Sequence, residues 1–114
     1  MVLNGHIFAT VSLFEYAQFS DNKEALEVVV KSLEGLIDIL PQFNINYPLI
    51  GPWAAYSLRK RRPASVYYQR MHVHQLKVLH ELTGHPTFLQ TAERWSTKLD
   101  SPIMHNMVKA HWVQ

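Results

Sequence analysis

The sequence is notable first for what it has little of: it contains no cysteine, four glycines and only 18% charged residues. The lack of cysteine excludes a disulfide framework and a thiolate metal site. Apolar residues make up 47% of the 114 positions, a balance typical of a globular chain with a buried core rather than of a disordered one. The length fits one modest domain, so we predict a single domain over residues 1–114.

Long hydrophobic runs are also lacking, and this bears on membranes and export. No apolar stretch approaches the roughly 20 residues needed to cross a bilayer, so no membrane partner is expected. Residues 1–10 have no basic n-region, and Asn4, Gly5 and His6 interrupt their hydrophobic stretch, which makes a poor signal peptide. The compartment is therefore left open, with the cytoplasm as the default.

The first forty residues are expected to form a pair of helices. Apolar residues recur at steps of three and four over 3–19 and again over 26–40, which predicts two amphipathic helices. Asp21 followed by Glu24 resembles a capping box at the start of the second helix, and Pro41 marks its end. The short polar connection predicts an antiparallel αα-hairpin over 1–40.

The middle of the chain has a different composition. Residues 43–53 are rich in asparagine, proline and glycine, as loops are. The runs 55–58 and 66–68 carry aromatic and β-branched residues and flank a turn-like basic segment, 59–65. This pattern predicts a small β-hairpin over 53–68.

Helical spacing returns in the last third. Val73, Leu76 and Leu79 repeat at helical intervals, Gly84 suits the end of that helix, and Pro86 suits the first turn of the next. We predict a second αα-hairpin over 71–100, followed by a short helix or an ordered tail. The expected fold class is mainly α: αα-hairpins with a small β-hairpin in the middle.

The basic run Arg59-Lys60-Arg61-Arg62 is the first candidate binding feature. Guanidinium groups bind phosphate, sulfate and carboxylate bidentately. The run is interpreted first as a solvated turn and second as a contact for an anionic carbohydrate. A nucleic-acid interface is disfavoured, because no recognition-helix pattern or zinc site accompanies the run and the net charge is only +2.

His72 and His74 invite a metal, but their spacing argues against one. On a helix, two residues at i and i+2 point about 200° apart, and no Asp or Glu with ligand spacing completes a site. Packing or a substrate contact is the favoured interpretation. We expect no metal and no cofactor.

Tyr56, Tyr67 and Tyr68 have two interpretations. They are either aromatic residues that pack in a hairpin, or general acids and bases with a pKa suited to proton transfer. In the second case Arg59 would neutralise a substrate carboxylate.

Together these motifs resemble the C-terminal domain of the heparan and heparosan D-glucuronyl C5-epimerases. The resemblance covers roughly residues 2–99. It lies in the opening Val2-Leu3-Asn4-Gly5-His6-Ile7-Phe8, in Tyr56-Ser57-Leu58-Arg59, and in the block Tyr67-Tyr68-Gln69-Arg70-Met71-His72-Val73-His74-Gln75-Leu76. Such a resemblance implies part of an (α/α) toroid or barrel, and a reaction that removes the C5 proton of a uronic acid and returns it on the other face.

The resemblance also implies roles for particular residues. Tyr56 and Tyr68 match catalytic tyrosines of the family. The expected substrate-binding residues are Arg59, His72, His74 and Asn4.

Some positions depart from the family pattern. The glutamate-tyrosine pair that the family carries upstream of the Leu-Asn-Gly opening is absent from this sequence. Ser57 replaces an acidic residue, and His74 replaces an asparagine. We therefore expect a partial or C-terminal domain of an epimerase-like protein that is inactive or weakly active alone.

The alternative is a non-catalytic carbohydrate-binding or structural module. In both cases the partner would be a uronic-acid-containing polysaccharide. The helix faces that an incomplete toroid exposes predict a homodimer or higher oligomer.

Overall fold

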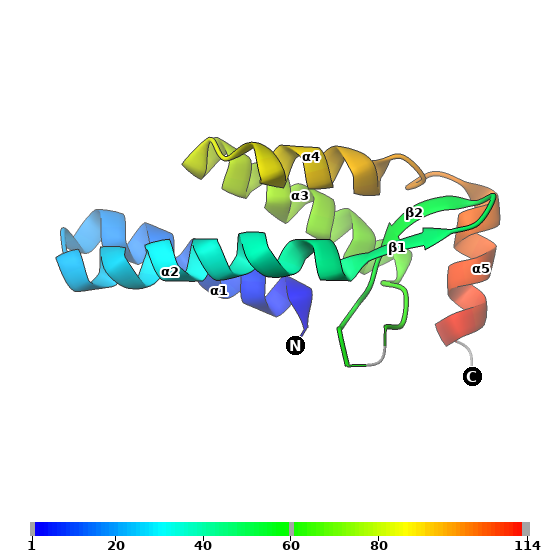
Figure 1. Cartoon of the computed structure of the whole chain (residues 1–114), viewed down its shortest axis with the longest axis horizontal. Helices are drawn as coiled ribbons and strands as arrows, with labels where there is room; N and C mark the ends of the chain where they lie inside the picture. The colour runs from blue at the N-terminus through cyan, green and yellow to red at the C-terminus, as the bar shows by residue number, and fades with distance from the viewer. Residues whose placement is uncertain (1, 60, 113–114) are drawn as a thin grey trace.

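The computed structural model of the chain describes residues 2–59 and 61–112 and is mainly helical (Figure 1). Two helical hairpins lie side by side, and a two-stranded sheet with a last helix lies at one end of them. In chain order the elements are α1 (Leu3–Ser20), α2 (Lys23–Ile39), the 3-10 helix η1 (Leu40–Phe43), β1 (Asn44–Tyr47), β2 (Gly51–Ala54), α3 (Val66–Thr83), α4 (Pro86–Ser96) and α5 (Pro102–Trp112).

The first hairpin consists of α1 and α2, within the predicted range 1–40. The connection differs in detail from the prediction. Asp21 adopts a left-handed conformation that ends α1, and Asn22 caps α2 by accepting hydrogen bonds from the amides of Glu24 and Ala25 at 2.9 and 3.3 Å. The N-cap is therefore Asn22 rather than Asp21, because the left-handed turn at Asp21 leaves the next residue at the start of the helix.

The predicted β-hairpin over 53–68 is wrong in position. The two strands are β1 and β2, paired antiparallel with Asn44 opposite Ala54. The run at 66–68 is instead the first turn of α3, because the Ser65 hydroxyl accepts a hydrogen bond from the Tyr68 amide at 3.2 Å and caps the helix there. Helix capping thus outweighs the strand preference of the aromatic residues.

A tight turn joins β1 to β2. The Ile50 amide donates to the Tyr47 carbonyl at 3.1 Å, with Pro48 and Leu49 at the two central positions. Leu49 has φ of 68° and its side chain is fully exposed. Proline followed by a residue of positive φ defines a type II turn, whose second central position favours glycine or asparagine.

We therefore expect Leu49→Asn to stabilise the protein by about 1 kcal/mol, because asparagine adopts this conformation at lower cost than leucine. Urea unfolding at constant pH measures the change. Leu49→Ala is the matched control, since it removes the exposed side chain and keeps the strain. Equal stability of the two variants would contradict the assignment of strain to this position.

The core lies between the two hairpins. α1 packs against α2 and against α3, and α3 packs against α4. Its largest fully buried members include Leu3, Leu36, Phe43, Leu76 and Trp95. A separate buried cluster of Trp53, Met104 and Val108 fixes α5 against the sheet.

Helices α1 and α3 begin at the same end of the molecule. Val2 forms a β-bridge with Ser57, in the segment that follows β2, and Ser65 at the end of that segment starts α3. This end of the molecule therefore gathers two helix N-termini around segment 55–65. Within residues 2–59 and 61–112, no helix has the length and apolar character needed to span a bilayer.

Candidate functional site: a tyrosine pair at two helix N-termini

Tyr56 and Tyr68 lie in contact, with ring centroids 5.0 Å apart and planes inclined by 54°. Backbone hydrogen bonds position Tyr56: its carbonyl accepts from the Leu3 amide at 3.4 Å, and its amide donates to the Arg62 carbonyl at 2.8 Å. Tyr68 projects from the first turn of α3. The structure therefore brings together the two tyrosines that the sequence singled out, from segments twelve positions apart.

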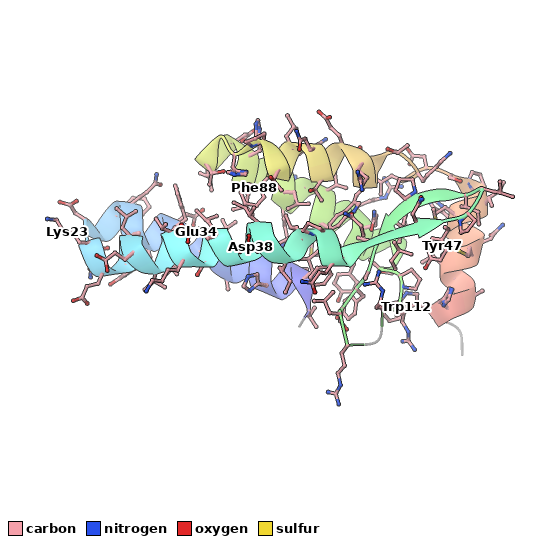
Figure 2. All side chains as sticks on the ribbon, viewed as in Figure 1. Lys23, Glu34, Asp38, Tyr47, Phe88 and Trp112 are labelled. Carbon is pink, nitrogen blue, oxygen red and sulfur yellow. The ribbon has the colours of Figure 1, made fainter. Side chains whose placement is uncertain are left out.

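Trp112 and Arg62 extend the pair into a larger aromatic and cationic cluster. The Trp112 ring meets Tyr56 edge-on at 5.5 Å, and the Arg62 guanidinium lies over the same indole at 4.7 Å. The Trp112 indole N–H donates to the Pro63 carbonyl at 2.8 Å, which holds the end of α5 against this segment (Figure 2). Sequence reasoning missed Trp112, because nothing in the spacing connects the last helix to residues 56–63.

The electrostatics of this end favour an anion. The N-terminal ends of α1 and α3 carry partial positive charge, and neither first turn, 3–6 nor 66–69, contains an acidic residue. Arg62 adds a full charge beside the aromatic rings, and Arg59 is exposed on the same segment. A carboxylate-bearing ligand is therefore the kind of molecule that this surface attracts.

Partial burial, and secondarily the neighbouring Tyr68 hydroxyl, raise the pKa of Tyr56 above its usual value of 10. The phenol is protonated at neutral pH, as at the usual pKa of tyrosine, and the raised pKa makes it a weaker acid. Tyr56 is therefore a hydrogen-bond donor at neutral pH, and it would give up its proton only to a strongly basic acceptor such as a carbanion.

The basic run does not act as one patch. The Arg61 guanidinium donates to the backbone carbonyls of Gln42 and Asn44 at 2.7 and 3.0 Å, and so ties the segment to the start of β1. Arg62 stacks on Trp112, and Lys60 lies outside the described residues. Arg59 is exposed and makes none of these contacts, so it is the member of the run best placed to meet a ligand.

His72 lies in the interior, where the expected substrate contact stays a prediction. The side chain is 0% exposed and packs against Trp95, with centroids 5.9 Å apart. His72 stands at helical spacing from Gln69, Leu76 and Leu79, so it falls on the buried face of α3. Burial lowers its pKa to about 4, and neither ring nitrogen has a hydrogen-bond partner within residues 2–59 and 61–112.

His74 lies on α3 two residues further on and is exposed. Two residues apart on a helix, the two rings point in widely different directions, and they cannot share a ligand. In the described part of the chain, no three His, Asp or Glu side chains gather in a way that could hold a metal ion. A substrate contact by His74 stays a prediction.

Asn4 takes part in the contact between α1 and α3. Its side-chain nitrogen lies 3.9 Å from the Met71 sulfur, and its backbone carbonyl accepts from the Gln75 side chain at 3.2 Å. Met71 is one helical turn beyond Tyr68 on α3. Asn4 therefore helps to hold the start of α1 against α3, and a direct substrate contact by Asn4 stays a prediction.

Fold and site together define a small helical domain with a paired-tyrosine site at two helix N-termini. The family model of the D-glucuronyl C5-epimerase C-terminus matches residues 1–97, and the chain belongs to this family.

An uncharacterized protein of Methanocaldococcus jannaschii is 27% identical over 94 residues. The alignment covers 82% of this chain and 29% of that protein, so the chain spans less than a third of the length of the relative. No solved structure gave a significant match.

Proposed function

We propose that this domain binds one uronic-acid unit of a polysaccharide at Tyr56 and Tyr68, and that it supplies the proton-transfer group on one face of the sugar for C5 epimerisation. The contact between the two tyrosines is the observation that carries this proposal, and the Tyr56 carbonyl also accepts from the first amide of α1 while Tyr68 lies in the first turn of α3. Membership of the epimerase family supports the reaction class.

The cationic surroundings fit the charge that develops in this reaction. Removing the C5 proton leaves an electron pair that is delocalised into the adjacent carboxylate. Positioned cations and helix N-termini stabilise such a charge without reorganising. Arg59 is the residue proposed to bind the carboxylate, and Arg62 with Trp112 forms a wall of the site.

The short distance between the two tyrosines limits the acid/base roles that they can have. Inversion at C5 needs one acid/base group on each face of the sugar ring. With centroids 5.0 Å apart the two phenol rings touch, and a pyranose ring does not fit between them. Both tyrosines therefore face the same side of the substrate.

We propose the following sequence of proton movements. A base on the opposite face takes the C5 proton, and the Tyr56 hydroxyl donates its proton to C5 from its own face. The phenolate then regains a proton from solvent, and in the reverse direction it takes the C5 proton from this same face. Tyr68 supports Tyr56 through the contact between the two rings. The opposite base is proposed to come from a protein segment outside this sequence.

The helix arrangement fits a segment of an (α/α) toroid, which we also propose. In such a toroid the inner helices pack against one another and each is followed by an outer helix. Here α1 packs against α3, and each is followed by an antiparallel partner, α2 or α4. The tyrosine pair would then lie at the mouth of the inner layer.

Arg59→Gln tests the binding role. We expect about a tenfold weaker affinity for a glucuronic-acid polymer, because one charge-assisted hydrogen bond contributes about 1.5 kcal/mol. Calorimetric titration measures the change, and Lys77→Gln, an exposed cation on α3, is the control. Unchanged affinity of Arg59→Gln would remove Arg59 from the site. Tighter binding to DNA than to the polymer, with a steep salt dependence, would point to nucleic acid instead.

The alternative function is a carbohydrate-binding module without catalysis. Tyr56→Phe separates the two: a catalytic site loses proton transfer at C5, whereas a binding module loses only affinity.

We also propose that a second copy of the chain covers the exposed apolar face of the first hairpin. Phe8 and Phe19 of α1 are 68% and 91% exposed, and Leu26 and Val30, one turn apart on α2, are about half exposed. The hairpin projects from the rest, and the radius of gyration is 15.0 Å against about 13 Å for a compact chain of this length. In an antiparallel pair of α2 helices, Lys31 of one copy can lie opposite Glu27 or Glu34 of the other, so the two copies have complementary charges.

Light scattering at micromolar concentration is expected to give the mass of a dimer. Phe19→Ser should shift the protein towards monomer without unfolding it, because the Phe19 side chain is already in solvent. Tyr67→Ser, at an aromatic residue on α3 that is 68% exposed, is the control. A monomeric wild-type protein would contradict the proposal.

A further inference from the structure

A second surface with features of a ligand site lies along α4. Thr87, Gln90, Thr91 and Arg94 occupy positions i, i+3, i+4 and i+7 of the helix, so they form one stripe of hydrogen-bonding side chains that ends in a cation. All four line the same hollow of about 280 Å³, together with Pro41 and Asn44.

The stripe continues onto the sheet. A second hollow of about 300 Å³ is lined by Asn44, Asn46 and Arg94, with Ile45 and Pro52 contributing apolar surface. Asn44 and Arg94 belong to both hollows, so the two form one continuous groove across α4 and β1. Its size lies at the lower end of small-ligand sites, and it combines donors and acceptors with a few apolar patches.

Arg94 is the only charged side chain that lines the groove in the described part of the chain. The ion pair found within residues 2–59 and 61–112 is Arg70 with Asp100, so no carboxylate neutralises Arg94 there. A guanidinium among amides and hydroxyls matches a ligand that bears a carboxylate and several hydroxyl groups.

We propose that this groove binds an acidic sugar residue, as a second contact for a uronic-acid polysaccharide. Arg94 would hold the carboxylate, and Asn46 with Gln90 would bind hydroxyl groups. The inference takes its polymer class from the proposed function and adds a separate subsite to it. Asn44 connects the two places: its carbonyl holds Arg61 of the tyrosine segment, and its side-chain oxygen accepts from the Trp95 indole at 2.7 Å.

The three tryptophan indoles offer separate reporters. The Trp95 N–H is bonded to Asn44 in the groove, and the Trp112 N–H lies at the tyrosine site. The Trp53 N–H is bonded to the Ala64 carbonyl in the interior and serves as an internal control. Each gives its own nitrogen–proton signal in the NMR spectrum of a 15N-labelled protein.

The experiment titrates the labelled chain with oligosaccharides that contain unsulfated glucuronate, of increasing length, and with neutral glucose oligosaccharides as controls. Glucuronate oligosaccharides are expected to shift the Trp95 indole signal and the side-chain amides of Asn44 and Asn46, and to leave Trp53 unmoved. Arg94→Gln should lose the Trp95 shift and bind long oligosaccharides about tenfold more weakly. It should keep the Trp112 shift.

The same titration separates failure of this inference from failure of the proposed function. No shift at Trp95 or Asn46, with Arg94→Gln binding like wild type, overturns the groove and leaves the tyrosine site standing. A shift at Trp95 without one at Trp112 supports the groove and removes the tyrosine site. Equal shifts with neutral oligosaccharides would contradict the role of Arg94.

Discussion

Replacing Gln69 with leucine is expected to lower the free energy of unfolding by about 3 kcal/mol, since two buried backbone groups lose their partners at about 1–3 kcal/mol each. Gln69 is fully buried. Its side-chain oxygen accepts from the Ala54 amide at 3.2 Å, and its side-chain nitrogen donates to the Trp95 carbonyl at 3.1 Å.

The two bonds join β2 and α4 through a single side chain of α3. Ala54 ends β2, and Trp95 lies in the last turn of α4, where helix carbonyls have no partner within the helix. Gln69 itself follows Tyr68 on α3. Losing it should therefore loosen the sheet, α4 and the tyrosine site together.

Chemical unfolding at neutral pH measures the effect. Gln18→Leu, an exposed position on α1, is the matched control and should change stability by less than about 0.5 kcal/mol. A loss in Gln69→Leu no greater than in this control would contradict the bridging role.

Protonation of His72 is expected to destabilise the protein in acid. The pKa is about 4 in the folded state and about 6.5 when unfolded, so the unfolded chain binds the proton more tightly between these values. Above pH 6.5 His72 is neutral in both states and the free energy of unfolding is unaffected by it. As the pH falls from 6.5 to 4, the free energy of unfolding decreases, because the unfolded chain takes up the proton first. The shift corresponds to about 3 kcal/mol at most.

His72→Leu isolates this contribution. Between pH 6.5 and 4, the free energy of unfolding of the variant should fall less than that of wild type, by up to about 3 kcal/mol. His74→Gln, two residues along the same helix but exposed, should keep the wild-type slope. Parallel profiles of wild type and His72→Leu would show that His72 is solvated in the folded state.

Much of the helical architecture could be predicted from local spacing. Apolar periodicity, Gly84 and Pro86 mark the helices well, because each depends on neighbours within a few residues of the chain. Gly84 does adopt the left-handed conformation that ends α3, and Pro86 occupies the first turn of α4.

The misplaced β-hairpin and the buried His72 have separate local origins. The run at 66–68 has strand-like residues, and only the Ser65 cap shows that it begins a helix. His72 stands at helical spacing from Gln69 and Leu76, and this spacing places it on the buried face of α3.

The candidate site was only half predictable. Tyr56, Tyr68 and Arg59 lie in motifs whose order the sequence displays, whereas Trp112 and Gln69 act through contacts between distant parts of the chain. The Arg94 groove depends on Asn44, fifty positions away, and only folding brings the two together.

The proton-transfer role of the tyrosine pair is tested most directly by deuterium exchange at C5. The purified chain is incubated in deuterium oxide with a polymer of unsulfated glucuronate and, separately, with one containing its C5 epimer, and C5 is followed by NMR. The chain alone is proposed to serve one face, on which the Tyr56 phenolate takes the C5 proton and the phenol returns a deuteron. Deuterium is therefore expected at C5 of just the sugar whose C5 proton faces Tyr56, with its configuration retained, and Tyr56→Phe abolishes the exchange. Inversion at C5, or exchange in neither polymer, would contradict the account.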